Sequence, residues 1–210
     1  MGRWEPGTRE RLQDAALELF EYGYDNTTAA QIAQRAGTSK STFFRHFADK
    51  REVLFAGTGE ITDRAVAAIA GLPPGITAFD LVNEVLRAII EVFDPAKRAW
   101  YGRRQAIVDH NPELRERDLL KRQSQNEAIT TALREKGLDG LSLDLVVALI
   151  GLASHATYTR WIEAPDSQDV AALATDVLAE LRTTTTTLIP AAATARPTSP
   201  GAGARPPVAP

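Results

Sequence analysis

Apolar residues recur every three or four positions along most of this chain, which is the spacing of amphipathic helices. The first such stretch runs over residues 8–23, where Leu12, Leu19 and Phe20 share one face with two alanines. No stretch alternates apolar and polar residues in the way that a half-buried strand does. The pattern therefore predicts an all-α fold.

Two short helices follow, at residues 28–36 and 40–47, with a turn at Gly37 between them. Thr28 and a glutamine three residues later form a capping box at the start of the first helix. Ser39 is placed to cap the second helix through its hydroxyl group. A short helix, a glycine turn and a second short helix are the pattern of a DNA-binding helix-turn-helix.

The second of these helices has two different faces. At about 100° per residue, Phe43 and Phe47 fall on one face, which is expected in the core. The opposite face carries Ser41, Thr42, Phe44 and Arg45, with Lys40 and His46 on its flanks. Side chains of these kinds contact base edges in a DNA major groove, so this face is the predicted contact surface.

Asp49 and Glu52 form a second capping box, and the helix that they start is expected to continue to about residue 70. Lys50 then lies in the first turn, where its ammonium group and the free N–H groups of the helix would hold one phosphate. The glycines and prolines of residues 71–75 end this helix. Its length predicts that it connects two domains.

The rest of the chain predicts five more helices, which are ended and restarted by proline, glycine and asparagine residues. Their expected ranges are 77–93, 96–109, 112–136, 141–163 and 168–188. Residues 1–54 are expected to form a three-helix DNA-binding domain, and residues 55–189 a helical bundle. Residues 190–210, rich in proline, alanine, glycine and threonine, are expected to be a disordered tail.

Charge is distributed unevenly along the chain. The whole chain is slightly acidic, with a formal net charge of −3 at pH 7. Residues 35–51 differ, because they hold five basic residues and one acidic residue, which is a local net charge of +4. Basic charge is thus concentrated where DNA contact is predicted.

The N-terminal segment, from about Thr8 to Leu54, carries a specific set of residues in a specific order. They are Ala15, Leu19, Phe20, Gly23, Tyr24, Thr27, Thr28, Ile32, Ala33, Ala36, Gly37, Thr38, Ser39, Thr42, Phe43, Phe44, Arg45, His46, Phe47 and Lys50. On these residues the segment resembles the N-terminal domain of the TetR family of bacterial transcriptional regulators. The resemblance implies a homodimer that binds double-stranded operator DNA. It also implies a C-terminal helical domain that binds a small-molecule effector.

The helix-turn-helix supplies the candidates for DNA contact. They are Thr27, Thr28, Thr38, Ser39, Lys40, Ser41, Thr42, Phe44, Arg45, His46 and Lys50. Phe44 stands where the family commonly has tyrosine, so its contact is expected to be apolar, for example with a thymine methyl group. Ser41 stands where the family often has glycine or proline, and its hydroxyl group can bond to a base edge. A two-fold protein is expected to bind an inverted repeat, with half-sites about 34 Å, or a multiple of this distance, apart.

Two helices near the C-terminus carry apolar faces that are expected at a dimer interface. Residues 145–153 are apolar all round the helix, which requires cover on more than one side. The predicted dimer residues, half of an intersubunit four-helix bundle, are Leu145, Leu149, Leu152, Val170, Leu173, Val177 and Leu181. The alternative is that both helices are simply buried within one subunit.

Aromatic and polar residues of the C-terminal helices are the candidates for effector contact. They are Phe93, Trp100, Tyr101, Arg104, His110, His155, Tyr158 and Trp161. Trp100 and Tyr101 are adjacent in a helix and are not both expected to face inward. His155 is expected to be buried with a hydrogen-bond partner. Plain core packing, or a solvated face for Arg104, is the alternative, and the effector is expected to be apolar or aromatic.

Several classes of chemistry are excluded by composition. The chain has no cysteine, which excludes disulfides, thiolate nucleophiles and zinc–cysteine sites. Its three histidines are too scattered for a metal site, so neither a metal nor another cofactor is expected. Residues 145–159 are too short and polar to cross a membrane, and residues 3–11 are too charged for a signal-peptide core. A cytoplasmic protein without membrane contact is expected.

The predicted function is that of a ligand-responsive transcriptional regulator, a repressor that its effector releases from DNA. Two other classes of protein are the alternatives. A helical adaptor would carry the helix-turn-helix but bind protein partners through its apolar helices. An enzyme would use His110 with Asp109, or His155, as a general base. No nucleophile or phosphate-binding loop accompanies these histidines, so an enzyme is not expected.

Overall fold

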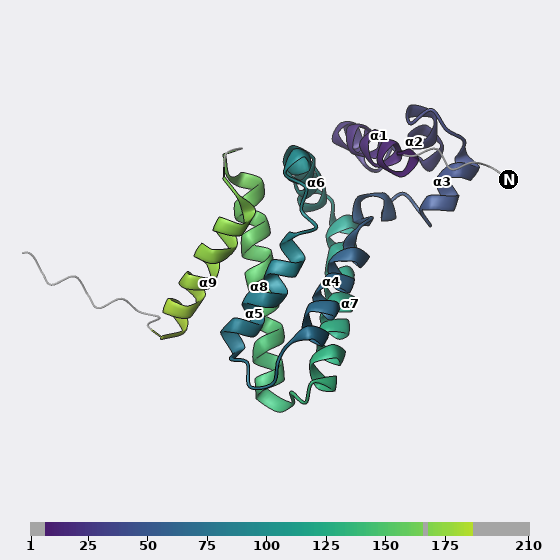
Figure 1. The fold of residues 1–210 in the computed structure, drawn as a ribbon. Coiled ribbons are helices and arrows are strands. Elements are labelled where there is room, and N and C mark those ends of the chain that lie inside the picture. The colour runs from purple at the N-terminus through teal and green to yellow at the C-terminus, as the bar shows by residue number, and fades with distance from the viewer. Residues whose placement is uncertain (1–6, 166–167, 187–210) are drawn as a thin grey trace, which may run out of the picture.

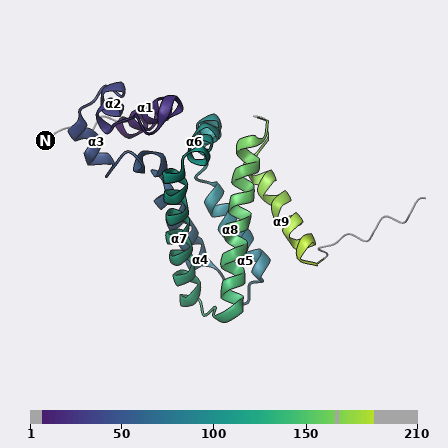
Figure 2. The same cartoon turned by 180° about the vertical axis from the view of Figure 1, so that it is seen from behind.

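The computed structural model describes residues 7–165 and 168–186. Within these residues the chain forms nine α-helices and two short 3₁₀ helices and has no strand, which confirms the all-α prediction (Figure 1). Helices α1 to α3 lie together at one end of the molecule, and the longer helices of the C-terminal part run side by side below them (Figures 1 and 2). The predicted tail at residues 190–210 lies outside the described residues.

The N-terminal helices are the ones that the pattern predicts. They are α1 (Thr8–Gly23), α2 (Ala29–Arg35) and α3 (Lys40–His46), followed by the 3₁₀ helix η1 (Glu52–Phe55). Thr28 and Gln31 make both bonds of the capping box, and the Ser39 hydroxyl accepts the backbone N–H of Thr42. Ile32 and Phe43 are fully buried between these helices, so the apolar faces of α1, α2 and α3 share one core.

The C-terminal part consists of six helices and one short 3₁₀ helix. They are α4 (Thr58–Gly71), α5 (Ala78–Ile90), η2 (Pro95–Lys97), α6 (Arg98–His110), α7 (Pro112–Glu135), α8 (Gly140–Glu163) and α9 (Val170–Thr186). Helix α4 packs between α5 and α7, and α8 packs against α5, α6, α7 and α9. Helix α6 lies across the end of this bundle and contacts α1 (Figure 1). The bundle therefore touches the helix-turn-helix through α6.

The predicted continuous helix from Asp49 to residue 70 is wrong. The chain forms η1, leaves the helical conformation at Ala56, and reaches a left-handed φ of 101° at Gly57 before α4 begins. Asp49 does cap the segment, since its Oδ1 accepts the backbone N–H groups of Arg51 and Glu52. Glu52 does not complete a capping box, because its carboxylate pairs with two basic side chains of α7.

Two apolar clusters organise the chain. One holds the helix-turn-helix and η1, and the other holds α4, α5, α8, α9 and the end of α7. Ile107, Val108 and Leu114, at the junction of α6 and α7, belong to the first cluster and join the two parts. The predicted boundary near residue 55 falls between Phe55, which is buried in the first cluster, and Ala65, which is buried in the second, and it stays a prediction.

Helix α8 is the most apolar long helix in residues 7–165 and 168–186. It alone among the described helices is long and apolar enough to cross a membrane by length and composition. Its position accounts for this composition, because it lies in contact with four other helices. Leu143, Ile150 and Trp161 of α8 are buried in the larger cluster.

Most of the predicted dimer residues pack inside the subunit, and their place at a dimer interface stays a prediction. Leu149, Val170, Leu173 and Val177 are buried in the larger cluster, and Leu181 is half-buried against it. Leu145 and Leu152 are different, since they are 50% and 52% exposed on the outer face of α8. Within the subunit the apolar stripe of α9 is covered, while α8 keeps an exposed apolar face.

Candidate DNA-binding surface and effector cavity

Helix α3 is fixed to the core by its aromatic residues. Phe43 is fully buried, and its ring centroid lies 5.6 Å from that of Phe47. The opposite face is directed to solvent, as the periodicity predicts, with Phe44 49% exposed. Lys40, Ser41 and Arg45 are also exposed on α3. The buried rings therefore hold a rigid helix whose outer face presents hydroxyl, aromatic and basic groups.

Hydroxyl groups gather at the N-terminus of α3. The Ser39 hydroxyl lies 2.8 Å from that of Ser41 and 3.0 Å from that of Thr42. Thr28 occupies the corresponding capping position of α2, where its hydroxyl group bonds to Gln31. Thr38, directly before Ser39, is half-buried. These groups lie at two helix N-termini, where backbone N–H groups and the helix dipole favour a phosphate.

Phe44 stands at the centre of the exposed face. Its ring makes an edge contact with Phe43 at 5.3 Å, and the Lys40 ammonium lies 5.9 Å from its centroid. These contacts orient the Phe44 ring on the outer face of α3. His46, at the end of the helix, is half-buried. Burial lowers the pKa of His46, and the nearby charges of Arg45 and Arg9 lower this pKa further.

Two predicted DNA-binding residues point elsewhere in the structure. Thr27 is buried, and its hydroxyl group donates to the carbonyl oxygens of Gly23, at 2.8 Å, and Leu19, at 3.3 Å. Lys50 lies in a turn rather than in a helix. Its Nζ donates to the carbonyl oxygens of Tyr24, Asp25 and Thr27, at 2.8, 3.4 and 3.2 Å.

The contacts of Lys50 in the structure differ from the phosphate contact expected from the sequence, which stays a prediction. Its Nζ also lies 4.1 Å from the ring centroid of Tyr24. The three N–H donors of the ammonium are directed at three carbonyl oxygens near the end of α1, which leaves none for a phosphate in this conformation. Lys50 therefore connects the segment after α3 to the C-terminus of α1.

A cavity of about 490 Å³ lies inside the C-terminal part, bounded by α4, α5, α6, α7 and α8. Six of the eight predicted effector residues line it, namely Phe93, Trp100, Tyr101, Arg104, His155 and Tyr158. Trp100 and Tyr101 both line it, contrary to expectation, with their rings edge to face and 5.5 Å apart. The cavity therefore contacts more than one face of α6.

Two predicted effector residues do not line this cavity. His110 is exposed at the end of α6, and its Nδ1 lies 2.7 Å from the carbonyl oxygen of Ala106. Trp161 is fully buried and stacks on Phe93, with 5.3 Å between ring centroids and 10° between ring planes. Trp161 therefore supports the wall of the cavity from behind.

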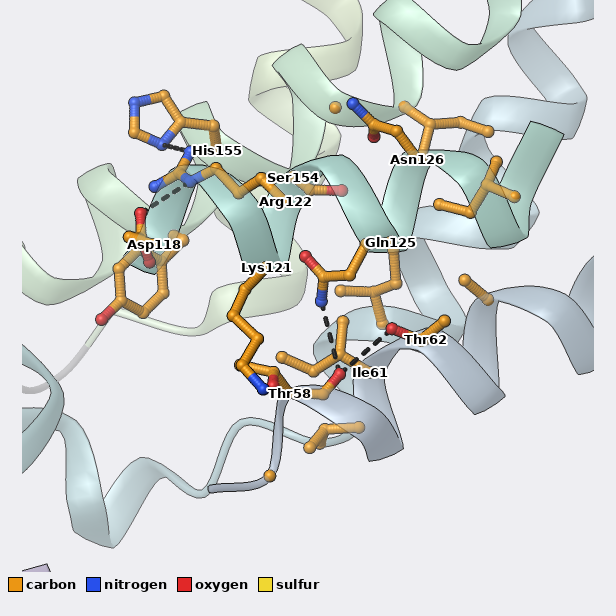
Figure 3. A pocket seen from close by; sticks show the side chains of 18 of the residues that line it. Thr58, Ile61, Thr62, Asp118, Lys121, Arg122, Gln125, Asn126, Ser154 and His155 are labelled. Atoms are coloured by element: carbon orange, nitrogen blue, oxygen red, sulfur yellow. Dashed lines mark hydrogen bonds and ion pairs between the residues drawn. The ribbon is translucent and has the colours of Figure 1, made fainter. Parts of the chain in front are cut away.

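The polar wall of the cavity was not predicted from the sequence. Helix α7 contributes Asp118, Lys121, Arg122, Gln125 and Asn126, several of which are shown in Figure 3. Their spacing of three and four residues places them on one face of α7, and this spacing is the one sequence feature that indicated a shared environment. Charged residues at such spacing are usually solvated, so the pattern alone did not indicate a cavity.

Arg104 organises the charged part of the cavity. This side chain is buried, not solvated, and its Nε donates to the carbonyl oxygen of Leu54 at 2.7 Å. Its Nη2 lies 3.4 Å from Oδ1 of Asp118, whose other oxygen accepts Nε of Arg122 at 2.8 Å. Because Leu54 belongs to η1, the contact joins the cavity to the segment that follows the helix-turn-helix.

His155 completes this chain of contacts. Its Nδ1 lies 3.0 Å from Nη1 of Arg122, as Figure 3 shows. The residue is largely exposed, so the expectation of a buried histidine is wrong, although it does have a partner. Partial burial lowers the pKa of His155, and the charge of Arg122 lowers this pKa further. The imidazole is therefore neutral at pH 7 and accepts the Arg122 hydrogen bond at Nδ1.

Two family models match the chain over most of its length. Residues 12–56 match the model of the bacterial regulatory proteins of the tetR family, and residues 76–186 match the model of the MftR C-terminal domain. The second match alone covers more than half of the chain. The chain belongs to the TetR family of transcriptional regulators.

Individual TetR-family relatives agree with this assignment. The chain is 25% identical over 170 residues to the regulator MftR of Mycobacterium tuberculosis, a match that covers 77% of this chain and 83% of that protein. It is 38% identical over 84 residues to the regulator TcmR of Streptomyces glaucescens, covering 40% of this chain and only 37% of that protein. The fold resembles the fatty acid degradation regulator FadR of Bacillus halodurans, with a TM-score of 0.54, 20% identity, and 86% and 96% of the two chains covered.

Membership of the TetR family decides between the classes of function. TetR-family proteins are transcriptional regulators and not enzymes, so no general-base role is assigned to Asp109, His110 or His155. In the part of the chain that the structure describes, no group of three or more acidic or histidine side chains lies close enough to hold a metal ion. The helix-turn-helix and the cavity are the two sites at which a TetR regulator would act.

Proposed function

We propose that this TetR-family protein is a homodimeric repressor that binds an inverted-repeat operator and releases it when a small effector enters the cavity. The observation that carries the proposal is the outer face of α3, which presents Lys40, Ser41, Phe44 and Arg45 to solvent. This face lies in a segment with a local net charge of +4 in an otherwise acidic chain. Local positive charge on a protruding helix is the electrostatic feature of DNA recognition.

The groups on α3 suggest how the operator is read. Arg45 can make two hydrogen bonds to a guanine, and Ser41 can bond to a base edge. Phe44, which has no hydroxyl group, is suited to a thymine methyl group or to sugar carbons. The capping residues Thr28 and Ser39 lie at helix N-termini, where the backbone N–H groups can contact phosphates.

The exposed face of α8 supports a homodimer. Leu141, Leu145 and Leu152 are exposed on it, and together with Ala148 they follow the four- and three-residue spacing of a helix–helix seam. Helix α9 exposes small residues, including Ala172, Thr175 and Ala179. We propose that the leucines of α8 pack on the small residues of α9 in a second subunit, which would build an intersubunit four-helix bundle.

The cavity contacts the segment that connects the helix-turn-helix to the bundle, which supports a role in controlling DNA binding. Its wall includes Leu54, Ala56 and Gly57, the point at which the chain leaves η1 and turns into α4. An effector that contacts this point can favour one spacing of the two helix-turn-helix units over another. The effect on operator affinity equals the preference of the effector for that state, typically about 1–3 kcal/mol. Such a regulator acts in the cytoplasm and needs no cofactor.

Fluorescence anisotropy tests the proposal directly. The protein is titrated onto the intergenic DNA next to its own gene and onto scrambled DNA of equal length, at two salt concentrations. We expect a salt-sensitive preference for the intergenic DNA. Arg45→Ala should abolish the preference, whereas Arg87→Ala, an exposed arginine of α5, should leave it unchanged. Equal weak binding to both DNAs would refute sequence-specific recognition.

A further inference from the structure

The cavity changes in character along its length. On α7 the lining residues run from Asp118, Lys121 and Arg122, through two amides, to Ile129. The rise of about 1.5 Å per residue separates the two ends of this series by roughly 16 Å. On α8, which packs against α7, His155 pairs with the charged end. The cavity therefore has a charged end near the helix-turn-helix and an apolar end deeper in the bundle.

The charged end has an excess of positive charge. Its lining side chains are Arg104, Lys121 and Arg122 against the single carboxylate of Asp118, with His155 neutral. The Arg104 side chain is 10% exposed, so an unbalanced charge there costs free energy, whereas Lys121 and Arg122, at 28% and 40%, are partly solvated and remain accessible to a ligand anion. The Asp118 side chain is only 17% exposed and is already shared between two arginines, so it cannot balance all three cations.

Lys121 is shared between the cavity and η1. Its Nζ lies 2.9 Å from Oε2 of Glu52, whose other oxygen accepts Arg117. Its side chain is 28% exposed and lies beside Thr58, as Figure 3 shows. An ammonium group has three donors, and the Glu52 carboxylate takes one of them. Lys121 can therefore donate to a ligand in the cavity, and an anionic ligand competes with Glu52 for its ammonium group.

The residues at the apolar end of the cavity indicate the chemical character of the part of the ligand that would lie there. Ile61, Ala65, Ile89 and Ile129, from α4, α5 and α7, line the cavity together with Val147 and Ile150 of α8. A volume of about 490 Å³ is in the range of sites for small organic ligands. A purely apolar ligand would leave the excess charge at the other end without a partner, and a cation would increase this excess.

We infer that the effector is an amphipathic anion, with an apolar body in the isoleucine-lined end and a carboxylate or similar anionic head held by Lys121 and Arg122. This inference rests on the proposed function and narrows the expected apolar effector to a charged one. The head group competes with Glu52 for Lys121 and with Asp118 for Arg122. Because Glu52 belongs to η1, the loss of this ion pair loosens the segment that connects the helix-turn-helix to the bundle.

The test uses acids and alcohols that share an apolar body. Hexanoate, decanoate, tetradecanoate and hydrocinnamate, each with the corresponding alcohol, are titrated into the full-length protein by isothermal titration calorimetry. We expect at least one acid to bind about tenfold or more tightly than its alcohol, as one hydrogen bond between charged groups would provide. Lys121→Gln combined with Arg122→Gln should remove this preference. Lys97→Gln, an exposed lysine of η2 that does not line the cavity, should preserve it.

A second experiment, on the protein–operator complex, distinguishes failure of this inference from failure of the proposed function. The preferred acid, added to the protein–operator complex, should release DNA from the wild type and not from the double variant. If alcohols bind and release DNA as well as the acids do, the inference of an anionic effector is wrong. The same holds if no acid binds while operator recognition is intact. Neither result contradicts the proposed repressor function. If acids bind with the expected preference but the protein never distinguishes operator from scrambled DNA, the proposed repressor function is wrong and the anion-binding site is supported.

Discussion

Replacing Lys50 by methionine removes the ammonium group and keeps the aliphatic part of the side chain. In the structure this ammonium donates to the carbonyl oxygens of Tyr24 and Thr27, at 2.8 and 3.2 Å, and more weakly to that of Asp25. It also lies over the Tyr24 ring. The substitution therefore removes a positive charge from the C-terminal end of α1, where such a charge is favourable.

The expected loss of stability follows from these contacts. A hydrogen bond to a charged group contributes about 1.5–3 kcal/mol, and a cation over an aromatic ring at a partly exposed site about 0.5–1 kcal/mol. Lys50 is half-buried, and the Tyr24 carbonyl oxygen keeps the backbone N–H of Thr27 at 3.1 Å, so solvent and this bond recover part of the loss. We expect the free energy of unfolding to fall by about 2 kcal/mol, or roughly 4–8 °C in Tm.

The assay compares Lys50→Met with the same change at Lys40, which is exposed on the outer face of α3. Urea unfolding measures stability, and operator affinity at several salt concentrations counts the phosphates that each lysine neutralises. Lys50→Met should destabilise the protein and leave the salt slope unchanged. Lys40→Met should change stability by less than about 0.5 kcal/mol and lower the slope by about 0.9 for one phosphate contact.

The reverse pattern would refute this reasoning. If Lys50→Met unfolds like the wild type and lowers the salt slope by one contact, Lys50 turns to the DNA and the phosphate role predicted from the sequence is correct. Lys50→Arg provides a further control, because it keeps the charge but changes the shape of the donor group. It should recover only part of the stability that Lys50→Met loses.

Three further predictions concern conformation, pH and the contact between the two parts of the chain. Gly57→Ala should lower the free energy of unfolding by about 1–2 kcal/mol, because φ is 101° there, whereas Gly59→Ala in α4 should not; urea unfolding of both variants tests this. The pKa of His46 is lowered below its usual 6.5, so His46 stays neutral at pH 7, and operator affinity should rise only below about pH 6.5 as its positive charge forms. The free energy of unfolding should fall over the same range, because the unfolded chain binds this proton more readily, and His46→Gln should show neither change. A double-mutant cycle on the Glu21–Arg103 pair, which joins α1 to α6 at 2.6 Å, should give at most about 1 kcal/mol. The hydrogen bond from Arg103 lowers the pKa of Glu21, so this coupling should disappear as the pH falls below about 4.5; a coupling that does not change with pH would contradict the assignment.

Local sequence was enough to predict α1, α2 and α3 and the face of α3 that is exposed to solvent. Thr28 and Ser39 cap helices through groups three residues away, and Phe43 and Phe44 are separated onto different faces by the geometry of one helix. Such features depend on neighbours within one or two turns, so they can be read without knowing the tertiary structure. Local sequence was only partly sufficient for Tyr158, because its position on a helix could be predicted and its cavity surroundings could not.

Tertiary structure alone decided what the longer side chains do. Lys50 reaches back to carbonyl groups more than twenty residues earlier, and Arg104 turns inward because the carbonyl oxygen of Leu54 is within reach. The sequence equally allowed both to be solvated. The polar wall on α7 was missed for the same reason, because Lys121 and Arg122 are spaced like a solvated helix face.

The break at Gly57 and the burial of α9 show most clearly what a local sequence pattern does not determine. A capping residue such as Asp49 starts a helical segment, but it does not specify where that segment stops, which in the structure is at Ala56. An apolar stripe such as that of Val170 and Val177 must be covered, yet the stripe does not specify whether its own subunit or another covers it. The sequence by itself determined which residues form helices and which faces are apolar. The tertiary structure determined which partners those faces and the charged side chains found, because contacts between distant segments depend on the arrangement of all the helices together.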